Sequence, residues 1–220
     1  MAARTLQNDQ RGAVFVELAI LLPIVVTVFF GSIDLLYLLY QWNAAAKAVE
    51  VGARIAAVSD PVAAGLNGLS DQAVLNGTPP GGTMPLFSVS CDGRLATCTC
   101  SGTCVGMAEN SYSAAAMNRL IFGRGSTSCG ENRSDHSAGM CDLLWSITSA
   151  NVVVVYQQTG LGYAGRPGGP VPTITVSLQN MQFELFFLSP FLGKSIAMPA
   201  MTTTITAEDL CSGGGMGSCD

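Results

Sequence analysis

Gly12 and Glu17 lie at the start of a long apolar stretch, Ala13–Tyr40, in which Glu17 is the first charged residue. The next charge is Asp34, which is also acidic, so the stretch itself offers Glu17 no cation. An unpaired carboxylate in such a segment costs roughly 2–3 kcal/mol when the segment lies in a membrane, and this cost favours pairing with a cation. Cleavage of the peptide bond after Gly12 would create an α-amino group on Ala13, one helical turn from Glu17. These residue types at this spacing indicate charge pairing at the start of a membrane helix.

A glycine followed by four apolar residues and a glutamate resembles the class III leader of type IV pilins and pseudopilins. The resemblance implies that a prepilin peptidase cuts between Gly12 and Ala13, so residues 1–12 would be a leader. It also implies that Glu17 pairs with the N-terminal amine of a neighbouring subunit during assembly.

Two other interpretations of this segment remain open. One is an ordinary single-pass anchor with an acid at the membrane interface. The other is a secretory signal peptide with Ala44–Ala46 as a cleavage site, although the apolar region of a signal peptide spans only about 7–15 residues.

The apolar stretch exceeds the ~20 residues that a helix needs to cross a bilayer. Helical periodicity continues through Gln41–Val58, where Glu50 and Arg54 have the spacing of an i,i+4 ion pair. Asp60-Pro61 predicts the end of the helix, because the residue before a proline avoids the helical region. A helix over residues 13–58 would be about 69 Å long, and Pro23 should bend it or loosen one turn.

The composition argues against a nucleic-acid partner and for a covered surface. Charged residues make up 11% of the chain and the sequence pI is about 4.7, whereas nucleic acid calls for a basic patch. From Pro61 onward there are ten acids and six bases. So few charges suit a subunit that is covered by neighbours.

The eight cysteines all follow the apolar stretch; they are Cys91, Cys98, Cys100, Cys104, Cys129, Cys141, Cys211 and Cys219. Arg4, Arg11 and the initiator amine against Asp9 leave the N-terminal segment net positive, which predicts a cytoplasmic N-terminus and extracytoplasmic cysteines. Disulfides persist there, and we expect them in preference to a zinc site, because the gaps do not form two C-x₂₋₄-C pairs. Eight cysteines allow 105 connectivities. The local guesses are Cys129–Cys141 and Cys211–Cys219.

The rest of the chain predicts a small antiparallel sheet with irregular loops. The strands are expected from Phe87, over Asn151–Gln158, over Thr173–Leu178 and over Met201–Ala207, since these runs are β-branched or alternate in polarity. Short helices are expected within Val62–Pro85 and over Glu109–Phe122. Met181–Leu192 contains four phenylalanines and predicts either core, including a helix under the sheet, or a surface that meets a subunit or skims a membrane.

No catalytic set is found, so the protein is not expected to be an enzyme or to need a cofactor or metal. His136 is the only histidine and is expected on a solvated loop. The glycine-rich connector Gly160–Gly169 lacks the Lys-Ser/Thr of a phosphate-binding loop.

The front of the chain, with NAAAKAVEVGARIAAV after it, and the C-terminal part resemble the TadE-like proteins of the tight-adherence (Tad) pilus, over about residues 13–60 and 150–210. The resemblance implies a minor pseudopilin that assembles or primes the pilus with other pilins and minor pseudopilins. A related TadF- or TadG-like subfamily and the position in the filament remain open.

The expected fold is α+β. Its parts are a leader (1–12), a transmembrane and extended helix (13–60), an extracytoplasmic domain (61–210) and a Gly/Ser/Cys tail (211–220). The chain would be a single-pass protein of the bacterial inner membrane with its N-terminus in the cytoplasm and its C-terminal domain outside it, with a surface pilus as a second expected location. The alternative is a membrane-anchored extracytoplasmic binding or adhesion module outside any pilus.

Overall fold

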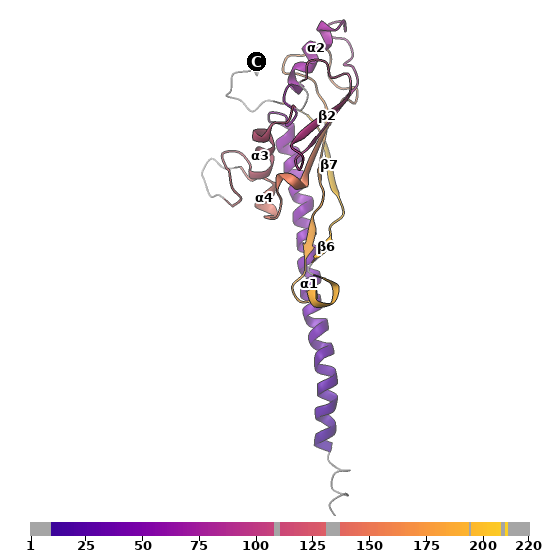
Figure 1. Cartoon of the computed structure of the whole chain (residues 1–220), viewed down its shortest axis with the longest axis vertical. Helices are drawn as coiled ribbons and strands as arrows, with labels where there is room; N and C mark the ends of the chain where they lie inside the picture. Colours follow the sequence, from indigo (N-terminus) through magenta and orange to yellow (C-terminus); the bar gives the residue numbers. More distant parts are fainter. Residues whose placement is uncertain (1–9, 108–110, 131–136, 194, 208–209, 211–220) are drawn as a thin grey trace, which may run out of the picture. The chain divides into compact units, whose positions relative to one another are not determined.

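The computed structural model describes residues 10–107, 111–130, 137–193, 195–207 and 210 (Figure 1). By their internal contacts the residues form two compact units. The first combines Met1–Gln41 with Gln182–Ile196, and the second combines Trp42–Met181 with Ala197–Asp220. The fold is α+β, as expected: a long apolar helix followed by an antiparallel sheet of five strands and a smaller sheet of two.

The N-terminal helix α1 runs from Gln10 to Ala57 and stays α-helical around Pro23. It ends next to Val58, close to the end expected from Asp60-Pro61. Leu, Ile, Val and Phe dominate its first three quarters. From Val14 to Phe29 these apolar side chains are exposed, so this part of α1 calls for a functional explanation.

The part of α1 after Gln41 belongs to the second unit and buries a face of small residues. The buried positions are Ala45, Ala48, Val49, Ala53 and Ala56, which repeat every three or four residues as a helix face requires. On the exposed side, Glu50 accepts hydrogen bonds from Lys47 at 2.6 Å and Arg54 at 2.5 Å. The hydrogen bond and charge of Lys47 hold the pKa of the Glu50 carboxyl below its ordinary value. The expected Glu50–Arg54 pair is therefore confirmed.

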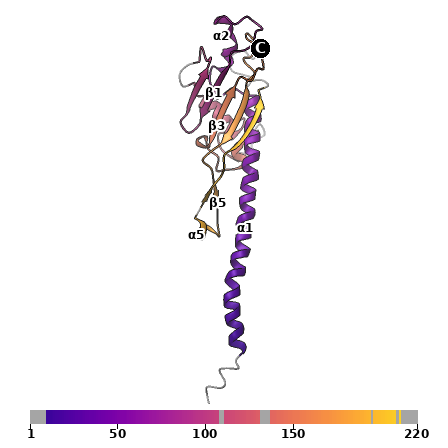
Figure 2. The same ribbon diagram turned by 90° about the vertical axis from the view of Figure 1, so that its right-hand side faces the viewer.

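The five-stranded sheet has the order β2-β1-β3-β4-β7, and every neighbouring pair is antiparallel (Figure 2). The strands are β1 (Phe87–Asp92), β2 (Thr97–Gly102), β3 (Val152–Gln157), β4 (Thr173–Leu178) and β7 (Met201–Thr206). Alternate side chains of β1, β3 and β4 are fully buried, as the period of a half-buried strand predicts. All four expected strands are present. The strand β2 was not expected.

Short helices lie between the strands: η3 (Leu66–Gly68), α2 (Leu69–Leu75), α3 (Ala114–Phe122), α4 (Met140–Leu143) and η4 (Ser149–Asn151). The expected helix at 109–122 begins only at Ala114, because the side chain of Ser113 caps it by accepting a hydrogen bond from the Ala116 amide. The glycine-rich connector Gly160–Gly169 joins β3 to β4 and is followed by a strand, whereas a phosphate-binding loop is followed by a helix.

A buried tyrosine ties the end of α1 to the sheet. The hydroxyl of Tyr156 in β3 accepts a hydrogen bond from the backbone amide of Val62 at 2.9 Å, and both residues are fully buried. Burial also raises the pKa of Tyr156 well above the ordinary tyrosine value. The neutral hydroxyl is therefore part of the folded state.

Replacing Tyr156 with phenylalanine should lower the free energy of unfolding by about 1–3 kcal/mol, because the buried Val62 amide would lose its acceptor. A raised pKa means that the tyrosine's contribution is complete below pH ~10 and is lost as the pH rises through the folded-state value. The difference in unfolding free energy between the wild type and Tyr156→Phe should thus narrow as the pH rises above ~10. Guanidinium unfolding of the full chain in detergent measures both effects. The half-exposed Tyr163 provides a matched control, Tyr163→Phe, and equal losses in both variants would contradict the account.

The first unit contains a second, smaller sheet. Strands β5 (Gln182–Glu184) and β6 (Ser195–Ala197) pair with each other, and α5 (Ser189–Leu192) lies between them in sequence. We refer to residues 182–196 as the 182–196 hairpin. The expectation of core holds for Phe183 and Leu185, which are buried. Phe186 and Phe187 are 58% and 44% exposed.

Candidate functional site

The structure places Gly12, Ala13 and Glu17 in the first turns of α1, with Ala13 and Glu17 one turn apart. The side chain of Glu17 is exposed, and the ion pairs found among the described residues do not include it. Glu17 is thus an acid within an apolar helix surface whose charge is available to another molecule.

The apolar part of α1 is uncovered. Side chains such as Val14, Phe15, Ile20, Val28 and Phe29 are each about 60–70% exposed. The helix from Val14 onward has a mean hydropathy of 2.5 in its most apolar window, and none of that window is buried. By length and composition α1 can cross a membrane. A core helix of a soluble domain would instead be largely covered by its own chain.

Asp34 is the charged residue that the sequence reasoning missed. Its side chain is buried, although it lies in the middle of an apolar run. The carboxylate accepts hydrogen bonds from three consecutive backbone amides of the 182–196 hairpin: Phe186 at 3.0 Å, Phe187 at 2.9 Å and Leu188 at 2.6 Å. Hydrogen bonds to a charged acceptor are roughly twice as strong as neutral ones. The carboxylate therefore holds the turn of the hairpin on α1.

Aromatic contacts flank this carboxylate on both sides along the helix. The ring of Phe187 packs on Phe30, with centroids 4.4 Å apart, and the ring of Phe186 packs on Tyr37 at 5.0 Å. Figure 2 shows α5 and β5 beside α1. The contacts on either side of Asp34 exclude water from the carboxylate and strengthen its hydrogen bonds.

Gln41, two helical turns after Asp34, makes a further contact with the 182–196 hairpin. Its side-chain amide donates to the carbonyl of Glu184 at 3.2 Å, and its side-chain oxygen accepts from the amide of Glu184 at 3.1 Å. This pairing satisfies one residue of β5 on both backbone groups, as a neighbouring strand would. Gln41 and Asp34 bind the backbone of the 182–196 hairpin to α1. Because backbone groups are the same for every residue type, the side chains of the hairpin do not indicate these hydrogen bonds.

Three disulfides occur among the described cysteines: Cys91–Cys98, Cys100–Cys104 and Cys129–Cys141. Cys91 and Cys98 lie opposite each other in the β1–β2 ladder. Cys129–Cys141 is the pairing guessed from the sequence. Cys211, Cys219 and His136 lie outside the described residues. No group of three metal-binding side chains occurs in the part of the chain that the structure describes.

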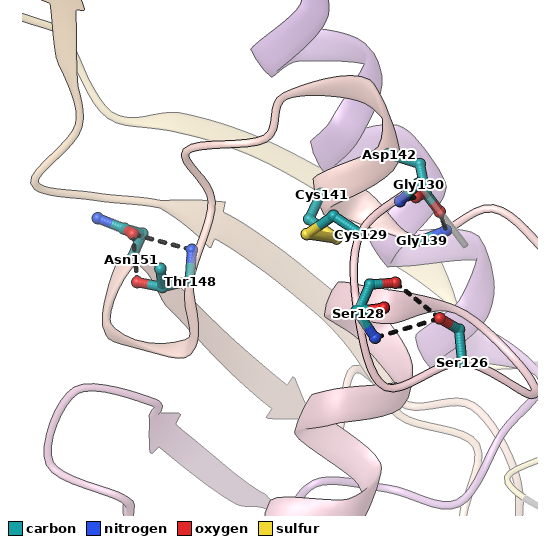
Figure 3. The surroundings of a disulfide bond; sticks show 9 residues. All are labelled: Ser126, Ser128, Cys129, Gly130, Gly139, Cys141, Asp142, Thr148 and Asn151. Atoms are coloured by element: carbon teal, nitrogen blue, oxygen red, sulfur yellow. Dashed lines mark hydrogen bonds between the residues drawn. A yellow bond between two sulfur atoms is a disulfide. The ribbon is translucent and has the colours of Figure 1, made fainter.

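Around Cys129–Cys141 the loop is held by one carboxylate (Figure 3). Asp142 accepts hydrogen bonds from the backbone amides of Gly130 at 2.6 Å and Gly139 at 2.8 Å. These contacts fix both ends of the loop that the disulfide closes. Asp142 and the disulfide thus hold together the described residues at the two ends of the loop.

The comparison with protein families bears on α1. Residues 12–54 match the family described as TadE-like protein. The N-terminal segment of this chain is TadE-like. The match begins at Gly12 and covers nearly all of α1, so the TadE-like segment is the exposed helix itself. No curated protein and no solved structure matches the chain significantly. The resemblance noted at 150–210 lies outside the TadE-like match.

Proposed function

We propose that the protein is a minor pseudopilin of a Tad-type pilus, anchored in the bacterial inner membrane by α1. The observation that carries the proposal is the uncovered apolar surface of α1, within a segment whose match to the TadE-like family begins at Gly12. A helix of this kind needs either lipid or other helices around it. A pilin-like subunit uses both in turn, first in the membrane and then in the filament.

The mechanism is structural. A prepilin peptidase cuts after Gly12, and the new amine of Ala13 and the carboxylate of Glu17 pair with their counterparts on neighbouring subunits. In hydrocarbon such a pair specifies the register between helices, because a shifted register would leave both charges unpaired. The N-terminus is cytoplasmic before cleavage, and the disulfide-bearing domain lies outside the cytoplasm. The domain primes or caps the filament.

Deleting the gene in a host that assembles Tad pili should abolish pili or reduce their number severely, and the intact gene should restore them. Electron microscopy of whole cells and the pilin content of sheared fractions measure this. The contrasting proposal is a membrane-anchored binding or adhesion module outside the pilus. It requires normal pili in the deletion strain with a loss of surface attachment alone, and that result would overturn the pseudopilin role.

A further inference from the structure

The inference concerns the turn of the 182–196 hairpin and rests on the proposed insertion of α1 into a membrane. Residues Val14–Ile33 form a charge-free helix apart from Glu17. At 1.5 Å per residue, twenty residues span about 30 Å, the thickness of the hydrocarbon core. Asp34 then lies at the boundary of the hydrocarbon on the C-terminal side of the span.

The turn also contacts residues of α1 that precede Asp34 and lie closer to the middle of the span. Phe187 packs on Phe30, one turn before Asp34. The side chain of Leu188 lies against Gly31, 3.7 Å from the position that a Cβ there would occupy. A groove of about 190 Å³ continues along the helix, lined by Val26, Thr27, Phe30, Gly31, Phe187 and Leu188. Apart from Thr27, its side chains are apolar or absent.

The exposed side chains of the turn match this position. Phe186 and Phe187 are about half exposed, and the neighbouring helix surface shows Leu35, Leu36 and Leu39 at 50–66% exposure. The turn thus adds two exposed aromatic side chains to a stretch of α1 whose exposed side chains are apolar. Aromatic side chains are enriched where membrane helices meet the interface.

The backbone amides of the turn also have the hydrogen-bond partner that an apolar environment requires. An irregular turn in hydrocarbon is disfavoured because its backbone amides lack water. Here Asp34 accepts hydrogen bonds from the amides of Phe186, Phe187 and Leu188. This role also explains why an acid lies at this place in the helix, because the carboxylate of Asp34 accepts hydrogen bonds from the turn instead of from water.

We propose that residues 186–188 insert into the phospholipid bilayer beside α1, with the Phe186 and Phe187 side chains among the acyl chains near the interface. The protein then contacts the membrane through two elements that Asp34 connects. Lipid is the occupant that the geometry favours over a second protein, because the turn lies at the level of a span whose side chains from Val14 to Phe29 are exposed and, under the proposed function, face lipid. The hairpin thereby sets the depth of α1 in the bilayer.

The test uses the full chain in nanodiscs of phosphatidylethanolamine and phosphatidylglycerol, with 4-trifluoromethylphenylalanine at one site at a time. The sites are Phe187 in the turn, Phe29 in α1 as a lipid reference, and Leu95 in the β1–β2 turn as an exposed apolar control. Fluorine resonances are recorded with a spin-labelled lipid and, separately, with a water-soluble gadolinium chelate. We expect the signals at 187 and 29 to be lost with the lipid label, and the signal at 95 to be lost with the chelate.

Each other outcome has a defined meaning. If the signal at 29 responds to lipid and that at 187 to the chelate, the inference is wrong while the membrane anchor stands. A signal at 187 that resists both agents indicates cover by protein and also overturns the inference. If the signal at 29 responds to the chelate, the proposed membrane insertion itself fails.

Discussion

Replacing Glu17 with alanine should leave cleavage after Gly12 largely intact and abolish incorporation of the protein into pili. In the proposed mechanism the peptidase acts on the bond before Ala13, whereas the carboxylate is needed only when a second subunit presents its amine. An amine left unpaired in hydrocarbon is costly, so the assembled state loses far more than the membrane-anchored monomer does. The expected change is a loss of the protein from sheared pili to background, with the membrane pool unchanged, as measured by immunoblotting both fractions.

The matched variants separate charge from packing. Glu17→Asp keeps the charge and should retain partial incorporation, whereas Glu17→Gln should behave like alanine. Leu21→Ala removes an exposed apolar side chain one turn along the helix and should have little effect. Normal piliation with Glu17→Ala would contradict the charge-pairing mechanism.

Replacing Asp34 with alanine should detach the turn of the 182–196 hairpin from α1. Three backbone amides would lose a common charged acceptor within an apolar contact, and no other described side chain can replace it. Hydrogen exchange of the amides of residues 186–188 should accelerate by roughly a hundredfold, because the local opening energy falls while the sheet of the second unit is untouched. Exchange followed by mass spectrometry or NMR on the full chain in nanodiscs measures this.

Two controls make the result specific to the carboxylate. Asp34→Asn keeps one acceptor oxygen and should give intermediate protection. Ser32→Ala removes a hydroxyl whose hydrogen bond stays within α1, to the carbonyl of Phe29 at 2.6 Å, and should leave the hairpin protected. Unchanged exchange with Asp34→Ala would mean that the aromatic packing alone holds the hairpin.

The regular elements could be predicted because each carries a local pattern. Thr173–Leu178 alternates in polarity and forms β4 over the expected residues. The strand β2 carries no such pattern, since Thr97–Gly102 consists of small and polar residues. It is a strand because it pairs with β1 and is joined to it by Cys91–Cys98. Such pairing with a neighbouring strand outweighs weak strand propensity.

The candidate site divides in the same way. Gly12 and Glu17 were predicted from their spacing at the start of an apolar run together with the resemblance to class III leaders, and their roles stay a prediction. The contact of Asp34 with residues 186–188 joins positions more than 150 apart in sequence and uses only backbone amides of the hairpin. The residue types at 186–188 therefore do not indicate that their amides bind a carboxylate. The one available signal was the presence of Asp34 within an apolar run, because an unpaired carboxylate there is costly and therefore indicates a partner.

The most direct test of the central claim is the mature N-terminus of the protein isolated from a host with its Tad machinery. Intact mass and N-terminal sequencing should show a chain that begins at Ala13 when the prepilin peptidase is present, and a chain that keeps residues 1–12 when the peptidase gene is deleted. Met1 retained in the presence of an active peptidase would contradict the claim that α1 is the assembly helix of a pseudopilin.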